Sequence, residues 1–407
     1  MISIDEQLRI IAQGAEEIIA MEELRAKLEH AQRTGKKLVV KLGLDPSAPD
    51  IHLGHTVVLR KIKQLQDLGH RAVLIIGDFT GMIGDPTGKS KSRRQLTREE
   101  VLVNARTYEQ QLFRILDPEK TELRFNSDWL GALSFAEVIA LASKSTVARM
   151  LERDDFHKRF VNQQSIGVHE LFYPLMQAYD SVELKADIEI GGTDQRFNIL
   201  FGRDVQRDYG LDRQVALFMP LLEGLDGTEK MSKSMGNYVG IDERPNDMYG
   251  KLMSIPDGLI ARYFELATDI HPDALAQIKA DLANSAINPR DVKMRLAREI
   301  TALYNGDGKA CEAEQNFIRM FQRKELPDDI PAFRVENALF IGDGIDLPKL
   351  LMATGMAKSA SDARRLITQG AVKLNGTKLS ELKLPTWNSG DVLQVGKLKY
   401  CRLLSEE

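Results

Sequence analysis

The chain has 407 residues, of which 43% are hydrophobic, and its 55 basic and 59 acidic side chains give a formal net charge of −4. At roughly 100–200 residues per domain, this length allows two to four domains with at least one large core. The composition excludes a disordered acidic chain and a uniformly basic nucleic-acid coat protein. The two cysteines, Cys311 and Cys401, are too few for a disulfide framework and fit a reducing compartment.

The sequence contains no internal repeat, no low-complexity tract and no membrane signal. No apolar run reaches the ~18 residues that a membrane-spanning helix needs. The acidic start, residues 1–6, lacks the basic region of a signal peptide. We therefore expect a cytoplasmic protein that does not enter a membrane.

The first elements of the chain predict a parallel sheet. Ser3 and Glu6 have the spacing of a capping box and open an amphipathic helical stretch. Two apolar, β-branched runs that are joined by a helix form a βαβ unit. The elements expected here are a helical stretch that ends near Gly35, a strand at 38–44, a helix at 54–68, a strand at 72–76 and a helix from Thr97 to about 116.

The rest of the chain predicts helices, two more strands and a small module at the end. Residues 131–180 and 245–325 have helical patterns, and 188–190 and 215–218 read as short strands. We expect an α/β fold: a parallel-sheet domain with an N-terminal helix (1–222), a loop (223–240), a helical domain (241–325), a linker (326–344) and a small basic α+β domain (345–407).

The C-terminal segment is basic, whereas the remainder of the chain is acidic. Between Leu347 and Leu404 there are ten basic and three acidic side chains. Ser359 can cap a helix that stops at Gly370, and two glycine-containing pairs, 375–376 and 396–397, suit hairpin turns. A charge excess alone can be a solvated surface. A basic face on a small module also suits the backbone of an RNA.

The tetrapeptide His52-Leu53-Gly54-His55 stands where a helix begins after a strand and a loop. Its two histidines are three residues apart and share one face of the first helical turn. The free N–H groups of a helix N-terminus suit phosphate, and Gly54 would let a flat base approach the backbone. Taken alone, the motif also fits two surface histidines at a helix cap.

A second motif, Lys230-Met231-Ser232-Lys233-Ser234, follows the strand at 215–218 and has glycines on both sides. Two lysines three residues apart can place two positive charges on a polyphosphate. By itself the pentapeptide also fits a solvated basic loop. The two motifs together, each after a buried strand, are much more specific.

The chain resembles the class I aminoacyl-tRNA synthetases, and among them the bacterial tyrosyl-tRNA synthetases. HLGH is similar to the HIGH signature of that class, and KMSKS is identical to its second signature. Further blocks resemble those of the tyrosine enzymes, and they occur in the same order: Gly43–Ser47, Gly81–Pro86, Leu175–Asp180 and Gly191–Gln195. The basic tail resembles a small RNA-binding module found in the bacterial members.

This resemblance implies a tyrosine–tRNA ligase with a two-step reaction. It implies that 1–222 is a Rossmann-like catalytic domain, 241–325 a helical tRNA-binding domain and 345–407 a small basic α+β RNA-binding domain. Tyrosine and ATP give tyrosyl-adenylate and pyrophosphate, and the tyrosyl group then passes to the 3′ end of tRNA(Tyr). It also implies a homodimer, with ATP as a substrate and Mg²⁺ following from the ATP chemistry. We expect no protein metal site, because the sequence contains no evident cage for the ion.

The resemblance also assigns candidate site residues. Catalytic or phosphate-binding positions are His52, His55, Lys230, Lys233 and Ser234, with Lys89 and Arg93 in a second basic loop. Positions near ATP are Asp45, Ser47, Gly54, Gly192 and Asp194. Tyrosine-binding positions are Lys41, Asp85, Tyr173, Gln177, Asp180 and Gln195. RNA-binding positions are Lys358, Arg364, Arg365 and Lys373.

Two positions bear on recognition of the substrate phenol. Asp180 matches the carboxylate that accepts a hydrogen bond from it, and phenylalanine would leave that group unpaired. Many tyrosine enzymes have a tyrosine where this chain has Lys41. We expect Lys41 to donate to the phenol oxygen or to pair with Asp180. Arg196 also stands where much of the family has a tryptophan.

Three other functions share some of these features. The tryptophan-activating relatives have the same signatures, but Asp180 and the RNA module favour tyrosine. Small nucleotidylyltransferases also use HxGH, although they need neither the long helical region nor the basic tail. An RNA-binding protein derived from a synthetase would be expected to have lost signature lysines or histidines, and here all are present.

Overall fold

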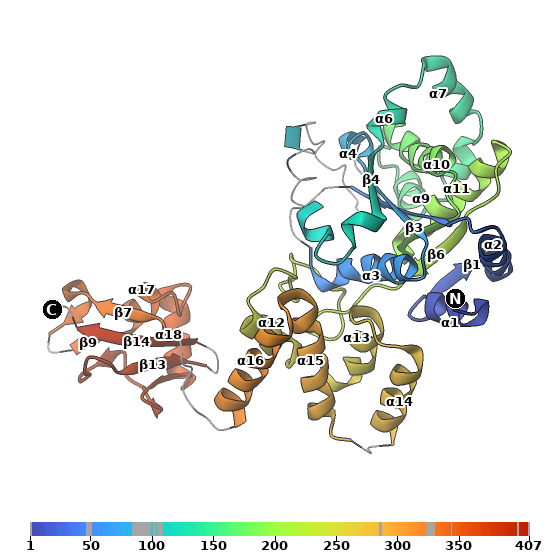
Figure 1. Ribbon diagram of the computed structural model, residues 1–407. Coiled ribbons are helices and arrows are strands. Elements are labelled where there is room, and N and C mark those ends of the chain that lie inside the picture. Colours follow the sequence, from blue (N-terminus) through green and yellow to red (C-terminus); the bar gives the residue numbers. More distant parts are fainter. Residues whose placement is uncertain are drawn as a thin grey trace. The chain divides into compact units, whose positions relative to one another are not determined.

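The computed structural model describes residues 2–45, 51–83, 99–100, 103, 109–284, 287–322, 330–342, 344–396 and 399–405. The chain forms two compact units, Met1–Phe317 and Ile318–Glu407 (Figure 1). None of the helices in the described ranges combines the length and the apolar surface that crossing a membrane requires.

The first unit is built around a six-stranded sheet of order β1-β6-β5-β2-β3-β4. Neighbouring strands run parallel except for β1, which is antiparallel to β6. The predicted βαβ unit is confirmed, since β2 and β3 pair in parallel from Val39↔Arg71 to Leu44↔Ile76. The strands are β1 (Glu17–Ile19), β2 (Val39–Leu44), β3 (Arg71–Ile76), β4 (Thr121–Phe125), β5 (Ile188–Gly192) and β6 (Val215–Met219).

The two central strands, β2 and β5, stay together only briefly. They pair at Val40↔Ile188 and Lys41↔Glu189, and no further pairing between them follows among the described residues. The chain order also reverses here, because β3 and β4 lie on one side of β2, and β5 and β6 lie on the other. Ligands of open α/β sheets bind at such a switch point, outside the carboxyl ends of the strands.

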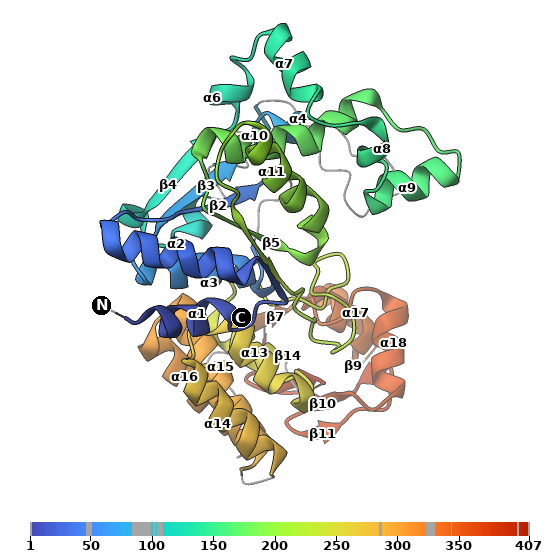
Figure 2. The same ribbon diagram turned by 90° about the vertical axis from the view of Figure 1, so that its right-hand side faces the viewer.

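Helices cover both faces of this sheet because its central strands are buried and apolar. Figures 1 and 2 show α3 on one face and α10 with α11 on the other. The helices around the sheet are α1 (Ile4–Ala12), α2 (Met21–Thr34), α3 (Leu53–Asp67), α4 (Thr80–Ile83), α10 (Phe172–Leu184) and α11 (Arg196–Asp208), with the 3-10 turn η3 (Thr193–Gln195) between β5 and α11.

Short helices connect β4 to α10, as predicted for residues 131–180. Ser134 caps one of them by accepting the Glu137 N–H, with the glutamate bonded back to Ser134. The elements of this segment are η1 (Pro118–Lys120), which precedes β4, then α6 (Ser127–Leu130), α7 (Phe135–Ala142), α8 (Val147–Met150), α9 (Asp154–Val161) and η2 (Val168–Leu171).

The helical segment after the sheet belongs to the same core as α1 and α3. Tyr249, Tyr263 and Phe264 are buried in a cluster that also contains Leu53 and Ile62 of α3. Its elements are α12 (Pro245–Leu252), η4 (Asp257–Leu259), α13 (Ile260–Ala267), α14 (Pro272–Ala283), α15 (Pro289–Asn305) and α16 (Asp307–Phe317). A π-helical turn, η5 (Ile318–Gln322), starts the second unit.

The second unit is a small α+β fold with its own core. A five-stranded sheet of order β11-β10-β13-β14-β7 and a three-stranded sheet of order β12-β9-β8 accompany two helices. The elements are β7 (Ala332–Val335), η6 (Asn337–Leu339), β8 (Phe340–Ile341), β9 (Gly344–Asp346), α17 (Leu347–Ala353), α18 (Ala360–Thr368), β10 (Val372–Leu374), β11 (Thr377–Lys378), β12 (Lys383–Leu384), β13 (Val392–Val395) and β14 (Lys399–Ser405).

The structure corrects the expected linker at 326–344. Strand β7 pairs in parallel with β14, and β8 pairs with β9, so both strands belong to the sheets of the second unit. The sequence hides this because β7 has only one buried side chain, Val335, and its partner strand lies at the far end of the chain. The sequence analysis also missed the short strands β1 and β4.

Several local predictions are confirmed by backbone geometry. The side chain of Ser3 accepts the Glu6 N–H, and Gly35 ends α2 in the left-handed region. Ser359 caps α18 through the Asp362 N–H. Asn375 and Gly376 both have positive φ between the antiparallel strands β10 and β11, as a two-residue hairpin requires. Part of the helix predicted over 97–116 lies outside the described residues.

Candidate active site

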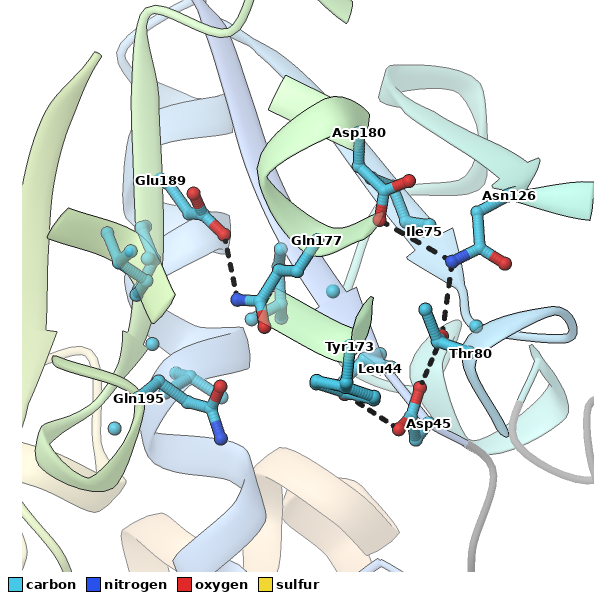
Figure 3. A pocket seen from close by; sticks show the side chains of 18 residues that line it. Leu44, Asp45, Ile75, Thr80, Asn126, Tyr173, Gln177, Asp180, Glu189 and Gln195 are labelled. Carbon is cyan, nitrogen blue, oxygen red and sulfur yellow. Dashed lines mark hydrogen bonds between the residues drawn. The ribbon is translucent and has the colours of Figure 1, made fainter. Parts of the chain in front are cut away.

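A cavity of about 200 Å³ lies at the carboxyl ends of the parallel strands, where β2 and β5 diverge. Leu42 and Ile75 contribute apolar walls, and polar side chains from α10 and from the strand ends reach into it (Figure 3). A pocket with apolar walls and a few directed polar groups suits a small amphipathic molecule.

Asp180 of α10 forms the buried end of this cavity. Its Oδ1 accepts a hydrogen bond of 2.8 Å from Trp129 Nε1, and its Oδ2 lies 3.5 Å from Asn126 Nδ2. Burial raises the pKa of Asp180 to about 7, although the charge of Lys41 and the bonds from Trp129 and Asn126 oppose the rise. The carboxyl group is therefore fixed in place, and it ionises close to neutral pH.

A chain of polar side chains runs from this end to Asp45, which follows β2. Tyr173 Oη donates to Asp45 Oδ2 at 2.8 Å, and Thr80 Oγ1 donates to Asp45 Oδ1 at 3.0 Å. Asn126 Nδ2 donates to Thr80 Oγ1 at 3.1 Å. Gly77 must lack a side chain, because a Cβ there would lie 2.1 Å from Asp45 Oδ1.

Gln177 and Gln195 contribute amide groups to the cavity in addition to that of Asn126. Gln177 Nε2 donates to Glu189 Oε1 at 3.2 Å, while Gln195 Oε1 accepts from Asn198 Nδ2 at 3.1 Å. In Figure 3 the two glutamines are on the Glu189 side of the cavity and Asp180 is on the Asn126 side. Asp180 and the two glutamines thus lie on opposite sides of the cavity.

Lys41 does not line the cavity, contrary to the expectation that it meets the phenol or Asp180. The side chain is fully buried, and its Nζ pairs with Glu189 Oε1 at 3.0 Å. It also donates to the backbone oxygen of Gln177 at 2.8 Å and to Ser181 Oγ at 2.7 Å. An ammonium group has three donors, and these contacts use all of them. Lys41 therefore acts on Asp180 only through its charge.

The predicted histidine pair is assembled at the N-terminus of α3. The rings of His52 and His55 stack with their centroids 3.8 Å apart. Burial, then the charges of His55 and Lys233, lower the pKa of His52 to about 3. His55 is partly open to solvent, yet desolvation and then Lys233 lower its pKa to about 4. At neutral pH both rings are uncharged hydrogen-bonding groups rather than cations.

Gly54 lies where a side chain would crowd the ring of His52. A Cβ at this position would lie 3.0 Å from His52 Cε1 and 3.1 Å from His52 Nδ1. It would also approach Met231 Cβ to 3.4 Å. The glycine therefore leaves room for the imidazole of its own neighbour and for the second motif.

The KMSKS segment lies against the histidine motif. Leu53 N donates to Val239 O at 2.9 Å, and His52 and Gly240 form an antiparallel bridge. Met231 is buried in the main core, while Lys230 and Ser234 are exposed. Because Lys233 lowers the pKa of both histidines, the two predicted motifs form one electrostatic unit.

The glycine pair at the end of β5 opens the other side of the site. A Cβ on Gly192 would lie 2.4 Å from Asp194 Oδ1, so the carboxylate is folded closely over the backbone. Asp194 itself is exposed in η3. The site therefore has a buried end at Asp180 and an open edge at the histidines, the lysines and Asp194.

Two family models match this chain and meet at residue 322. The model "tRNA synthetases class I (W and Y)" covers residues 33–322. The model "Tyrosine--tRNA ligase SYY-like C-terminal domain" covers residues 322–401. Tyrosine–tRNA ligase 2 of Clostridium acetobutylicum is 61% identical over 100% of both chains, and the tyrosine–tRNA ligase of Moorella thermoacetica is 56% identical over 98% of this chain and 95% of its own. The chain belongs to the tyrosine–tRNA ligase family.

Solved structures agree with this membership. The tyrosyl-tRNA synthetase of Archaeoglobus fulgidus, solved with L-tyrosine, matches 77% of this chain and 100% of its own with a TM-score of 0.62 and 25% identity. The mitochondrial enzyme of Aspergillus nidulans, truncated at its C-terminus, covers 79% of this chain and 95% of its own with a TM-score of 0.64 and 21% identity, a likeness of fold alone. As a member of the family, the chain is a class I, ATP-dependent aminoacyl-tRNA synthetase.

The remaining candidates of the tyrosine–tRNA ligase site are partly outside the described residues. Ser47, Asp85, Lys89 and Arg93 all lie there. Within the ranges that are described, no group of three or more His, Cys, Asp or Glu side chains could hold a metal ion.

The candidate RNA-binding residues lie on the second unit. Lys358, Arg364 and Arg365 are exposed around α18, and Lys373 is half-buried on β10. Arg365 pairs with Asp362 at 2.6 Å, whereas Arg364 makes no ion pair with any described residue. The helix therefore presents basic side chains to solvent.

Sequence reasoning missed several residues of the site. Thr80 and Asn126 link its two ends, Trp129 holds Asp180, and Glu189 bonds Gln177. Asn126 directly follows β4, so recognition of that strand would have drawn attention to it. Glu189, a lone carboxylate inside an apolar strand, was the signal for a buried partner.

Proposed function

We propose that the cavity binds L-tyrosine with its phenol against Asp180, and that ATP lies along the open edge beside His52, His55 and Gly192. One observation carries the proposal: a buried carboxylate, Asp180, stands at the closed end of a cavity whose walls include the apolar side chains of Leu42 and Ile75. Asp180 can accept the phenol proton in a hydrogen bond, which phenylalanine cannot supply. Tyrosyl-tRNA synthetase is itself the standard example of an enzyme that rejects phenylalanine in this way without editing.

The polar chain supports the placement of the rest of the amino acid. Gln177 and Tyr173 are positioned toward the substrate ammonium, with Asp85 as a third candidate, and Gln195 is positioned toward the carboxylate. The reaction then has two steps. The tyrosine carboxylate attacks the α-phosphate of ATP, the bond to pyrophosphate breaks, and tyrosyl-adenylate remains. A hydroxyl group at the 3′ end of tRNA(Tyr) then attacks the acyl carbon and releases AMP.

The open edge supports stabilisation of phosphate charge without a protein nucleophile. Neutral His52 and His55 can donate N–H groups to phosphate oxygens, while Lys230 and Lys233 supply positive charge. Such fixed donors and cations act where negative charge develops in the transition state. Asp194 is exposed beside Gly192 and can accept from ribose hydroxyl groups. Lys89 and Arg93 remain candidates for the same phosphates.

Mg²⁺ in this proposal arrives with ATP and is bound chiefly by its phosphates. Magnesium usually binds through few carboxylates and substrate phosphates. The ion neutralises phosphate charge, and the residues of the chain position the nucleotide. A cytoplasmic location follows the same proposal, since the reaction serves protein synthesis.

The second unit is proposed to bind the backbone of tRNA(Tyr). Its exposed basic side chains support this role, since binding to phosphates releases counterions and weakens with salt. Changing Arg364 and Arg365 to Ala should reduce the slope of log affinity against log salt by about one unit for each phosphate that is no longer bound. Filter binding of tRNA(Tyr) across a salt series measures the slope. An unchanged slope and affinity would exclude these arginines from the RNA interface.

We also propose a homodimer. Exposed apolar side chains follow one another on α7, α8, α9 and η2, including Phe135 at 80% and Val168 at 73% exposure. Exposed apolar surface of this kind marks an interaction site, and homo-oligomers are most often two-fold dimers. Changing Phe135 and Phe160 to Asp should shift sedimentation from dimer to monomer. Sedimentation as a monomer before any substitution would contradict the proposal.

The activity is tested by ATP–pyrophosphate exchange with each of the twenty amino acids, without tRNA. Exchange is expected with tyrosine alone. Exchange with tryptophan or phenylalanine instead would change the substrate and preserve the reaction class. No exchange with any amino acid, in folded protein with Mg²⁺ present, would contradict the proposed activity.

A further inference from the structure

A buried ion pair closes the cavity from behind. Lys41 on β2 and Glu189 on β5 occupy the last register position at which the two strands pair. Their side chains are 0% and 2% exposed, and Lys41 Nζ lies 3.0 Å from Glu189 Oε1. Apolar residues of similar size often stabilise a fold at least as well as a buried ion pair. Stability alone is therefore a weak reason for this pair at this place.

The pair is bonded to the wall that carries the substrate-facing groups. Lys41 Nζ donates to Ser181 Oγ at 2.7 Å and to the backbone oxygen of Gln177 at 2.8 Å. Glu189 Oε2 accepts from Ser181 Oγ at 3.1 Å and also from Gln214 Nε2. Both charged side chains thus hydrogen-bond to the same turn of α10, and their ion pair fixes each of them in position.

The fixed position of Glu189 determines which way the amide of Gln177 faces. An ionised carboxylate can only accept hydrogen bonds, so Glu189 Oε1 selects the NH₂ group of Gln177, which donates to it at 3.2 Å. The carbonyl oxygen, Gln177 Oε1, is then directed away from Glu189 (Figure 3). This oxygen is buried, and it has no hydrogen-bond partner among the described residues. A buried acceptor without a partner is costly and calls for an explanation.

We propose that Glu189, fixed by Lys41, is a positioning residue that turns the carbonyl oxygen of Gln177 toward the ammonium group of bound tyrosine. An ammonium group can only donate hydrogen bonds. If the amide of Gln177 faced the other way, its NH₂ group would point at the ammonium group, and no hydrogen bond could form between them. The inference rests on the proposed function, because it takes the cavity to be the tyrosine site. It explains the unpartnered oxygen and the buried pair together.

The test separates the ammonium group from the rest of the ligand. Glu189→Gln replaces the carboxylate by an amide that can donate as well as accept, so Gln177 is free to rotate. Lys41→Met combined with Glu189→Gln removes both charges and leaves no unpaired cation in the core. The matched control is Glu183→Gln, which changes an exposed carboxylate on α10, the helix that carries Gln177. Equilibrium binding is measured for tyrosine, for tyramine, and for 3-(4-hydroxyphenyl)propionate, which lacks the ammonium group.

Both Glu189 variants should bind tyrosine and tyramine about tenfold more weakly, the effect of weakening one hydrogen bond to a charged group. Binding of 3-(4-hydroxyphenyl)propionate should change less than about twofold on the same grounds, and the control should leave all three unchanged. An equal loss for all three ligands would reduce the pair to a structural role, and no loss for any of them would overturn the inference.

The two proposals fail in different ways. If the unaltered protein prefers neither tyrosine nor tyramine over phenylalanine, the proposed function fails before any variant is considered. If tyrosine binds normally and the Glu189 variants retain the preference for the ammonium-bearing ligands, the function stands and the positioning role of Glu189 is refuted.

Discussion

The two ends of the site are built in opposite ways. The closed end, which we propose for the tyrosine side chain, is buried, and its carboxylate, Asp180, is held by Trp129 and Asn126. The phosphate end is open, with Lys230 and Ser234 exposed and only Met231 of that motif buried. Selecting one amino acid requires groups that cannot adapt to a wrong ligand. Stabilising a leaving pyrophosphate requires positive charge in a place that the product can leave.

The largest effect is expected from the open end. Lys233→Ala removes a positive charge at the histidine motif, so the exchange rate should fall about 100-fold or more, while tyrosine affinity stays within about twofold. Pre-steady-state kinetics separates the two quantities. Lys36→Ala, at an exposed lysine after α2, is the control and should change neither. A weakened tyrosine affinity with an unchanged rate would show that the two ends are not divided as described.

A smaller effect of the opposite kind is expected at the closed end. Asp180→Asn keeps the shape of the side chain and removes the charged acceptor. The kcat/KM for tyrosine should fall about 100-fold, as for loss of a hydrogen bond to a buried charge. Activation of phenylalanine should change little, so the discrimination between the two amino acids shrinks. Equal losses for tyrosine and phenylalanine in the exchange assay would mean that Asp180 does not read the phenol.

The pH dependence distinguishes the ends without a substitution. Asp180 has a pKa of about 7, so its ionised fraction, and with it tyrosine affinity, should fall about tenfold between pH 7 and about pH 5.7. Titration of tyrosine binding against pH measures this, and Asp180→Asn should remove the dependence. His52 and His55 have pKa values of about 3 and 4, so they should add no step between pH 5 and pH 8. A second step in that range would contradict the neutral histidines.

The ionisation of Asp180 affects the stability of the fold in the opposite direction from tyrosine binding. Because the pKa of Asp180 is raised in the folded state, the folded state binds the extra proton between pH 4 and pH 7. The contribution of this group to stability is full below pH 4, and it is lost as the pH rises through 7. Chemical denaturation of the protein and of Asp180→Asn at several pH values should show this difference. A difference that does not vary with pH would contradict the raised pKa.

The smallest effect is expected from crowding the histidine motif. Gly54→Ala places a methyl group about 3 Å from the His52 ring, which must shift by a few tenths of an ångström. The exchange rate should fall about fivefold, since catalysis is sensitive to small displacements of a positioned group. Gly250→Ala in α12 has no atom within 4 Å of the added methyl group and serves as the control. Equal rates for both variants would show that His52 tolerates the displacement.

Local patterns were sufficient for much of the scaffold. Ser3, Gly35 and Ser359 mark helix ends because capping and positive φ act within a few residues. The buried β2–α3–β3 unit was visible because its apolar runs have no polar interruption apart from Lys41. Strand β4 was missed because it is half-buried throughout and contains charged residues, Glu122 and Arg124.

The contacts of the site depend on residues far apart in the chain. Lys41 was expected at the phenol because it lies close in sequence to the motif that carries Asp45, yet its partner is Glu189 on another strand. Asp180 was recognised by its surrounding block, whereas Trp129 and Asn126 bond to it from the segment that follows β4, about 50 residues earlier in the chain. No periodicity reports such pairings, which arise only when the sheet brings the strand ends together.

The position of β4 at the edge of the sheet has a consequence for changing the substrate. Asn126 and Trp129, which bond to Asp180, follow a strand that pairs with β3 alone among the described residues. A larger para substituent could be accommodated by moving this border strand outward, with no change to β2, β5 or the histidine motif. The protein is therefore built so that its choice of amino acid can be redesigned from the rim of the sheet while its chemistry at the centre is preserved.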